Sequence, residues 1–174
     1  MRRKFFDPRY VRYERRRVYR MALILFWSVL LGIVVHQYVI SSGIVSDRSM
    51  FPTLGDGDTF LINRYIYFFS DPKRGDIVVL QPFPGSFDWY IKRVVGLEGE
   101  TLAIRKGRVY INGQPLQEPY ARYTAPDRTY ILGRNMYFVM GDNRLNSFDS
   151  RNFGPIHRSR IIGRIKRGEL FAFW

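Results

Sequence analysis

The six residues Tyr90-Ile91-Lys92-Arg93-Val94-Val95 are rich in β-branched and aromatic side chains, a composition that predicts a β-strand. Side chains alternate along a strand, so Lys92 shares its face with Tyr90 and Val94. The interior of this strand therefore holds a lysine between apolar neighbours. Only five of the chain's 28 basic residues are lysines, so a lysine at this position calls for a reason.

The chain on both sides of this strand, from residue 43 onward, has the pattern of an all-β domain. Short runs rich in Val, Ile, Tyr and Phe alternate with turns that contain Gly or Pro, and helical periodicity is hard to find. Asn112-Gly113 is a strong signal for a tight hairpin turn, and Lys106-Gly107 is expected to join two further strands. The remaining strands are expected at residues 59–69, 76–80, 102–104, 108–111, 130–132, 136–140 and 161–165. About 130 residues suffice for a closed or sandwiched core, so the predicted fold class is mainly β, a barrel or sandwich.

A long apolar run precedes this domain. Met21 to Val35 is free of charged residues, and the run continues to Ile40. About twenty residues at 1.5 Å each span a bilayer core of about 30 Å, so we expect one N-terminal transmembrane helix at residues 21–42. The alternative is a cleavable secretory signal ending at Ser41-Ser42-Gly43, but the apolar core of such a signal is shorter, roughly 7–15 residues.

The basic charge of the chain is concentrated before the apolar run. The net charge is +13, and residues 1–20 contain nine cations against Asp7 and Glu14. Positive residues beside a span stay in the cytoplasm. The expected organisation is a cytoplasmic arm at 1–20, the helix at 21–42 and an extracytoplasmic β domain at 43–174, in a single-pass protein of the inner (plasma) membrane. Nucleic acid is not an expected partner, because no helix-turn-helix, zinc-finger or aromatic RNA-binding signature follows the arm.

A serine directly after the apolar run lies in a stiff, non-helical corner, Ser46-Asp47-Arg48-Ser49-Met50-Phe51-Pro52-Thr53-Leu54. Pro52 fixes its own φ and pushes Phe51 away from the helical region. Ser49 can simply satisfy a turn, as serine often does. It can also be a nucleophile, if the rest of the chain supplies a base.

Lys92 is the candidate base. Burial against apolar groups disfavours an ammonium and lowers its pKa, and lysine, unlike arginine, can then give up its proton. The alternative is that Lys92 extends its ammonium to solvent from the strand edge. His157 is a weaker candidate, because no Gly-x-Ser-x-Gly motif accompanies it.

The composition of the chain argues against catalysis by a metal ion or by a thiol. The chain has no cysteine and only two histidines, which excludes disulfides, thiolate catalysis and any obvious ligand cluster. We therefore expect no metal or other cofactor.

The third informative stretch is Met140-Gly141-Asp142-Asn143-Arg144-Leu145-Asn146-Ser147-Phe148-Asp149-Ser150-Arg151. Its density of Asp, Asn, Ser and Arg predicts a hydrogen-bonded loop, in which Asp142 and Asp149 can pair with Arg144 and Arg151. A salt-bridged surface turn is the alternative interpretation of the same residues.

Taken in order, Ser-Met-x-Pro-Thr-Leu, Arg-Gly-Asp-Ile-Val-Val, Tyr-Ile-Lys-Arg-Val-Val-Gly and Gly-Asp-Asn-Arg-x-x-Ser-x-Asp-Ser-Arg resemble the motifs of bacterial type I signal peptidases. The preceding apolar run matches as well, and the resemblance covers residues 20–165. It implies a signal-peptidase-like β-barrel domain and a serine endopeptidase that removes signal peptides from exported preproteins.

The resemblance also implies residue roles. By motif position, Ser49 is the nucleophile and Lys92 the general base. Ser147 orients the lysine, while Asp142, Asp149 and Arg151 are supporting residues. The apolar substrate groove falls on Val45, Met50, Leu54, Val79, Tyr90 and Ile91, and signal peptides with small residues at the first and third positions before the cut would fit it. No cofactor and no oligomer are implied, and the catalytic domain works at the lipid bilayer.

One position departs from the pattern of the family. Many members have a small or hydroxyl residue two positions before the nucleophile, where it assists the oxyanion hole, but here Asp47 occupies it. An ionised carboxylate would destabilise an oxyanion, so we expect Asp47 to turn away, toward Arg48, with the Ser49 N–H as the main donor. This departure keeps open a second hypothesis, a catalytically silent or specialised paralogue that acts as a membrane-anchored binding protein. A self-cleaving repressor shares the Ser–Lys chemistry but would carry a DNA-binding region in place of the span.

Overall fold

A computed structural model of the chain describes residues 8–38, 40–121 and 126–166. Contacts between residues divide the chain into two units, with the boundary between Val39 and Ile40. Parts of the predicted basic arm and of the C-terminal end of the predicted β domain, residues 1–7 and 167–174, lie outside the described residues.

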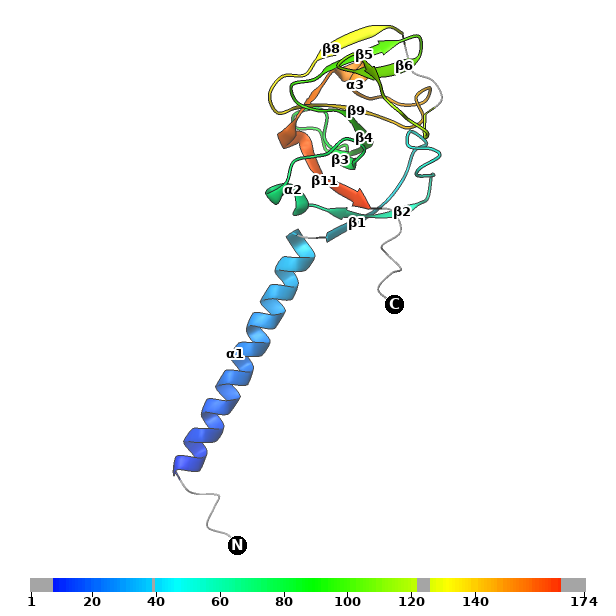
Figure 1. Cartoon of the computed structure of the whole chain (residues 1–174). Coiled ribbons are helices and arrows are strands. Elements are labelled where there is room, and N and C mark those ends of the chain that lie inside the picture. Colours follow the sequence, from blue (N-terminus) through cyan, green and yellow to red (C-terminus); the bar gives the residue numbers. More distant parts are fainter. Residues whose placement is uncertain (1–7, 39, 122–125, 167–174) are drawn as a thin grey trace. The chain divides into compact units, whose positions relative to one another are not determined.

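The first unit contains helix α1, Pro8–Tyr38, drawn in blue in Figure 1. Pro8 at its start is compatible with a helix, because a first-turn N–H has no intrahelical partner. The segment Arg15–Val34, with a mean hydropathy of 1.7, is long and apolar enough to cross a membrane. The helix ends before the predicted boundary at residue 42, since the backbone of Ile40–Ile44 pairs with residues 59–63 instead.

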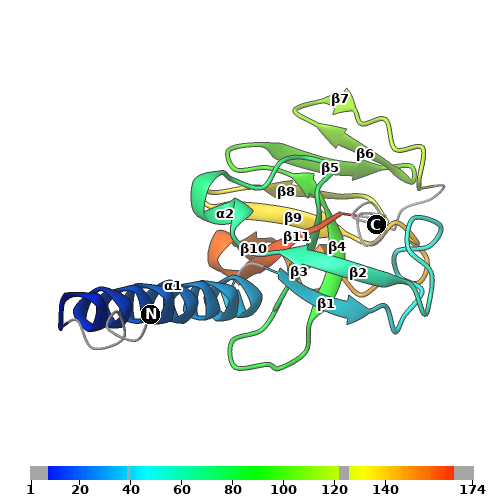
Figure 2. The ribbon, with the colours of Figure 1, turned by 90° about the horizontal axis from the view of Figure 1, so that it is seen from below.

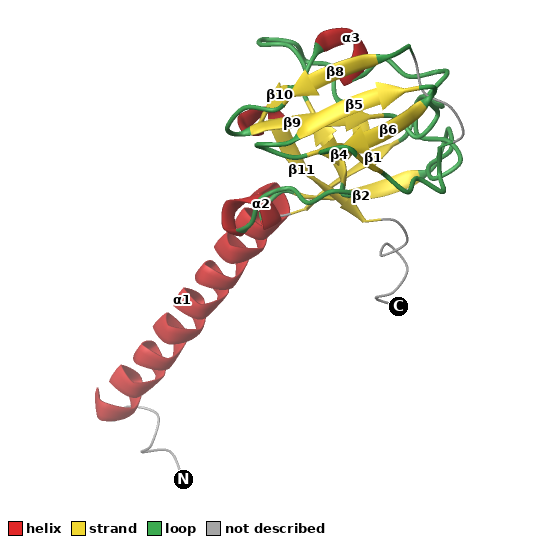
Figure 3. Ribbon diagram, turned by 45° about the horizontal axis from the view of Figure 1, so that its top comes forward, coloured by secondary structure: helices red, strands yellow, loops and turns green. Residues whose placement is uncertain are grey.

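The second unit confirms the mainly β fold class. Its larger sheet has seven strands in the order β1-β2-β11-β3-β4-β9-β10, and its smaller sheet has four in the order β7-β6-β5-β8. All the strand pairs are antiparallel, and Figures 2 and 3 show the strands curling around a common interior. The strands are β1 Ile40–Ile44, β2 Thr59–Asn63, β3 Ile77–Leu80, β4 Tyr90–Gly96, β5 Thr101–Arg105, β6 Arg108–Ile111, β7 Gln114–Pro115, β8 Arg128–Ile131, β9 Met136–Met140, β10 Ile156–His157 and β11 Ile161–Lys166.

Among the described residues of this unit there are three short helical segments: α2 Ile66–Phe69, α3 Ser150–Phe153 and the 3₁₀ turn η2 Arg158–Arg160. The prediction of one strand over residues 59–69 is therefore wrong in its second half. The Asn63 side chain accepts a hydrogen bond from the Ile66 N–H at 3.1 Å, which starts a helical turn where the aromatic composition favoured a strand.

Both predicted tight turns are confirmed. Lys106 and Gly107 have φ of 48° and 75°, and Asn112 and Gly113 have φ of 49° and 83°. Positive φ at both central residues matches the right-handed twist of the flanking strands, so these turns join β5 to β6 and β6 to β7 as two-residue hairpins.

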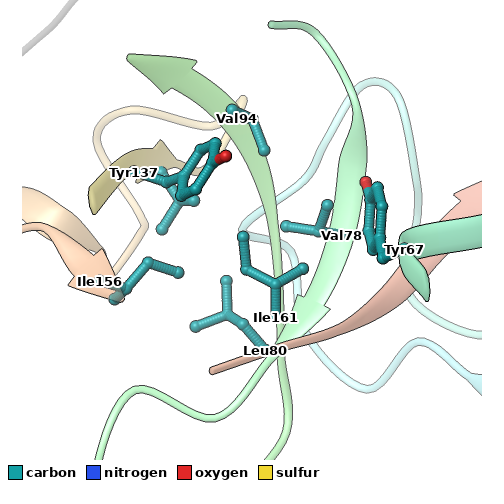
Figure 4. Packing of buried hydrophobic residues seen from close by; sticks show 8 residues of the cluster. Tyr67, Val78, Leu80, Val94, Tyr137, Ile156 and Ile161 are labelled. Atoms are coloured by element: carbon teal, nitrogen blue, oxygen red, sulfur yellow. The ribbon is translucent and has the colours of Figure 1, made fainter. Parts of the chain in front are cut away.

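Strand β4 lies where three hydrophobic clusters meet. Val94 belongs to the cluster shown in Figure 4, which also contains Leu80 and Val139. Ile91 packs against a second cluster around Met50, and Val95 belongs to a third, beneath the smaller sheet. Each fully buried aliphatic side chain contributes about 1.5–3 kcal/mol, so the strand that carries Lys92 is held firmly from several sides.

Candidate active site

Ser49 lies in the turn between β1 and β2, and the polar loop after β9 fixes its backbone. The Asn143 N–H donates to the Ser49 carbonyl at 2.9 Å, and the Asn143 side chain donates to the Arg48 carbonyl at 3.1 Å. The Leu54 N–H donates to the Met50 carbonyl at 2.9 Å, which closes the turn behind the serine. Ser49 itself is 5% exposed, so its hydroxyl lies at the edge of the interior.

Lys92 meets this serine from strand β4. Its Nζ donates to Ser49 Oγ at 2.7 Å, and the whole residue is only 1% exposed. The side chain therefore does not extend to solvent. Its nitrogen also lies 5.6 Å from the centre of the Tyr90 ring, on the same strand face.

The surroundings of Lys92 lower the pKa of its amine. Burial is the largest cause, and the positive charge of Arg151 acts in the same direction. The negative charges of Asp47 and Asp149 oppose it and raise the pKa, without cancelling the effect of burial. A neutral amine within hydrogen-bond distance of a hydroxyl can accept its proton, which is the requirement for general-base catalysis.

Asp142 connects the strand of the lysine to the turn of the serine. Its carboxylate receives two hydrogen bonds from Arg93, at 2.8 Å from Nε and 2.6 Å from Nη2, and one from the Thr53 hydroxyl at 2.5 Å. The predicted pairing of Asp142 with Arg144 is wrong, because the Arg144 guanidinium pairs with Glu118 instead. Sequence reasoning missed Arg93 and Thr53, although both stand inside the motifs that it singled out.

Asp149 and Arg151 form the ion pair that was predicted within the loop. Arg151 Nε and Nη2 each donate to the Asp149 carboxylate at 2.8 Å, and Asp149 is 0% exposed. The same carboxylate accepts from the Gly141 N–H at 2.9 Å and caps helix α3. Burial alone would raise the pKa of Asp149, but the hydrogen bonds and charge of Arg151, together with Gly141 and Ser147, lower it below its usual value.

Ser147 and the Ser49 backbone both lie against Gly141, on the side toward which a Cβ atom would point. A Cβ atom at Gly141 would come within 2.3 Å of Ser147 Oγ and 2.6 Å of the Ser49 carbonyl oxygen. The Ser147 hydroxyl donates to Asp149 at 2.7 Å, so its lone pairs, rather than its proton, are what it can offer to the Lys92 amine. Its role in orienting the lysine stays a prediction.

The expectation for Asp47 is wrong. Its carboxylate does not turn toward Arg48 but accepts a hydrogen bond from the Ser49 N–H, with a distance of 2.7 Å from N to Oδ1. The short side chain of an aspartate reaches the N–H two residues later and forms this local turn readily. The donor that was expected to stabilise the oxyanion is therefore occupied by a carboxylate.

The predicted groove residues differ in accessibility. Val45, Met50, Leu54 and Val79 are buried in one cluster beside the serine, each with at most 3% exposed, whereas Tyr90 and Ile91 are half-buried. Among the predicted groove residues, only Tyr90 and Ile91, at the start of β4, are thus partly accessible. That all six line a substrate groove stays a prediction.

Two surface cavities lie near the polar loop. One, of about 420 Å³, is lined by residues that include Phe51, Tyr120 and Asn143, and the other, of about 340 Å³, by residues that include Ser147 and Arg151. His157 lies elsewhere, at the exposed end of β10, where its Nδ1 contacts the Ser159 hydroxyl at 2.9 Å. Within the described residues, no three side chains of the metal-ligating kinds come together.

Known proteins are similar to this chain in sequence and in fold. The family described as "Signal peptidase, peptidase S26" matches residues 18–168. A signal peptidase I of Leptolyngbya laminosa is 39% identical over 84% of this chain and 75% of its own length. Signal peptidase I T of Bacillus subtilis (strain 168) is 35% identical over 80% of this chain and 78% of its own length. The crystal structure of a signal peptidase I from Enterococcus faecalis V583 superimposes with a TM-score of 0.50 at 33% identity, covering 56% of this chain and 98% of that one.

The fold and these relatives define a serine peptidase of the hydrolase class. The chain belongs to the signal peptidase family, peptidase S26. With its N-terminal apolar helix, it has the features of a membrane-anchored enzyme of that family.

Proposed function

We propose that this chain is a membrane-anchored serine endopeptidase that removes signal peptides from exported preproteins through a dyad of Ser49 and Lys92. The observation that carries the proposal is the 2.7 Å approach of the buried Lys92 nitrogen to the Ser49 hydroxyl. The relatives named signal peptidase I support the substrate class.

The reaction would proceed by acylation and deacylation. Neutral Lys92 takes the proton of the Ser49 hydroxyl while Oγ attacks the scissile carbonyl carbon, and the proton passes to the departing amine. The signal peptide is then held as an ester on Ser49. Lys92 next takes a proton from a water molecule, whose oxygen attacks the ester carbonyl carbon. The bond from that carbon to Ser49 Oγ then breaks, and the proton passes from Lys92 to Oγ, which releases the acid and restores the serine.

The neighbouring charged residues would act by positioning. The Asp142 carboxylate joins Arg93 on β4 to Thr53 beside the nucleophile. It would thereby fix the position of Lys92 relative to Ser49. The buried pair of Asp149 and Arg151 stiffens the loop that contacts the Ser49 carbonyl. We assign Ser147 the role of orienting the Lys92 amine through its oxygen.

The substrate would lie along the start of β4. Tyr90 and Ile91 offer partly exposed apolar surface next to the dyad, and the buried side chains of Val45, Met50, Leu54 and Val79 would form the floor beneath it. A floor packed this closely favours small side chains at the first and third positions before the cut.

The proposed location follows from the N-terminal segment. The apolar part of α1 that begins at Met21 would cross the inner membrane once, with the basic arm at residues 1–20 in the cytoplasm and the β unit outside. Anchoring enzyme and signal peptide in the same bilayer raises the effective concentration of one for the other.

Processing of a preprotein by the purified full-length chain tests this function. Wild type is compared with Ser49→Ala and Lys92→Ala, and with Ser46→Ala and Lys73→Ala as matched controls at exposed positions. We expect the two dyad variants to lose cleavage and the two controls to retain it. If either dyad variant cleaves as fast as wild type, the dyad is wrong.

The contact of Asp47 with the Ser49 N–H favours one alternative, a catalytically silent or specialised paralogue. A silent paralogue would leave several different preproteins uncut by wild type as well as by Ser49→Ala.

A further inference from the structure

The N–H of the nucleophilic serine is the natural donor to the oxyanion that forms when Ser49 attacks. An oxyanion hole needs donors aimed at the developing negative charge. Here that N–H already donates to Asp47 Oδ1 at 2.7 Å. A carboxylate and an oxyanion cannot share this single hydrogen without strong repulsion, since both are negative and each would lie about 3 Å from the same nitrogen.

Asp47 also acts on the base. The charges that act on the Lys92 amine are those of Asp47, Asp149 and Arg151. The Ser49 hydroxyl lies 2.7 Å from the nitrogen, and the centre of the Tyr90 ring lies 5.6 Å from it. Among the negative charges, Asp47 does most to raise the pKa of Lys92 against the effect of burial. It thereby favours the ammonium, which cannot accept the serine proton. Both effects of Asp47 oppose the attack.

The position of Asp47 allows its carboxylate to leave. The residue is exposed, whereas Ser49 and Lys92 beside it are buried. A rotation of its side chain about its own bonds would carry the carboxylate into water without disturbing the packed core. The backbone donor would then be available to a substrate carbonyl.

We propose that Asp47 is an autoinhibitory latch on this active site. Its carboxylate occupies the oxyanion donor of Ser49, and it must swing into solvent before the serine can attack a bound peptide. This inference rests on the proposed function, and it assigns to Asp47 a restraining role in the same reaction.

The competing explanation is a purely structural turn. Aspartate and asparagine both form the local hydrogen bond to the N–H two residues later, so a structural role would be preserved in Asp47→Asn. The restraining effect of a latch would be lost in Asp47→Asn, because the neutral amide does not repel the oxyanion and can present its own N–H to it. Asp47→Asn therefore separates the two explanations with almost no change in size.

The experiment measures kcat and the pH profile of kcat/KM for preprotein cleavage by the full-length chain in detergent. The variants are Asp47→Asn and Asp47→Ser, with Asp56→Asn as the control that removes another exposed carboxylate and Ser49→Ala as the inactive reference. A single oxyanion donor is worth about 10²–10³ in kcat in other enzymes. We expect kcat to rise about tenfold or more in both Asp47 variants, and the acidic limb of the profile to move to lower pH as the pKa of Lys92 falls. Asp56→Asn should change neither quantity.

Each outcome separates the latch from the proposed function. If wild type cleaves, Ser49→Ala is inert and Asp47→Asn is no faster than wild type, the latch is wrong and the function stands. If wild type is inert and the Asp47 variants cleave, the latch and the Ser49–Lys92 dyad are supported, and wild type is a latched peptidase and not a silent paralogue. If every variant is as inert as Ser49→Ala, the proposed function fails and the latch fails with it.

Discussion

Asp149→Ala would remove a carboxylate that satisfies five hydrogen-bond donors inside the β unit. These donors are Arg151 Nε, Arg151 Nη2, the Arg151 N–H, the Gly141 N–H and the Ser147 hydroxyl. The variant would leave the Arg151 guanidinium, whose side chain is only 8% exposed, without its charged partner.

The magnitude follows from the burial of this pair. Breaking a buried ion pair from one side costs about 3–5 kcal/mol, because the remaining charge is left uncompensated. For a β unit of this size we expect the melting temperature to fall by about 10–20 °C. Removing both partners in Asp149→Ala/Arg151→Met should cost less than removing Asp149 alone, since no buried charge then stays unpaired.

The effect should depend on pH with a definite sign. The pKa of Asp149 is lower in the folded protein than its usual value near 3.9, so the ionised carboxylate stabilises the fold fully above that value. This stabilisation is lost as the pH falls through the folded pKa. The difference between wild type and Asp149→Ala should therefore be largest near neutral pH and shrink in acid.

Thermal unfolding followed by circular dichroism, on the full-length chain in detergent, measures these effects. Asp88→Ala is the control, because Asp88 is an exposed loop carboxylate. A loss below about 1 kcal/mol for Asp149→Ala, or a double variant no more stable than the single one, would refute this reasoning.

Three further outcomes are expected. Lys92→Met should abolish cleavage yet raise stability by about 1 kcal/mol in thermal unfolding, because methionine fills a similar volume with no charge to desolvate; a lower melting temperature would contradict the burial argument. Gly141→Ala should slow cleavage about 100-fold by displacing Ser49, since the new Cβ would lie 2.6 Å from the Ser49 carbonyl oxygen. Gly133→Ala, whose Cβ would meet nothing nearer than 3.8 Å, should cleave like wild type. Equal cleavage rates for the two glycine variants would contradict the explanation by a steric clash at Gly141. The pH profile of kcat/KM should lose activity as the pH falls through the pKa of Lys92, which burial lowers, and a flat acidic limb would exclude Lys92 as the base.

Sequence reasoning succeeded where one residue and its near neighbours determine the structure. The alternating pattern of β4 placed Lys92 in a strand interior, and the structure buries it there. The Asn112-Gly113 turn follows from a backbone conformation that few other residue pairs adopt.

Pairings between distant residues could not be predicted in the same way. Asp142 has Arg144 two positions away, yet it pairs with Arg93, which is 49 positions distant and is brought close by the pairing of β4 with β9. Arg144 forms its ion pair with Glu118. Several arginines can satisfy one carboxylate, so only the folded sheet decides among them.

Local choices between two feasible conformations were also missed. Residues 66–69 have the composition of a strand, but a single side-chain hydrogen bond from Asn63 starts a helical turn there. Asp47 could turn toward Arg48 or toward the Ser49 N–H. Attraction between opposite charges favours Arg48, but the structure has the contact with the Ser49 N–H. Differences of about 1 kcal/mol decide such cases, and residue patterns do not resolve them.

The central claim is that Lys92 is a base with a lowered pKa, and titration of its amine tests this claim most directly. The full-length chain, labelled at lysine with ¹³C and ¹⁵N, is followed by nuclear magnetic resonance in detergent, and Lys92→Arg assigns the signal among the five lysines. We expect Lys92 to titrate below the usual value near 10.4, at the pH where the acidic limb of cleavage lies. A Lys92 signal that titrates at the usual lysine value would contradict the account.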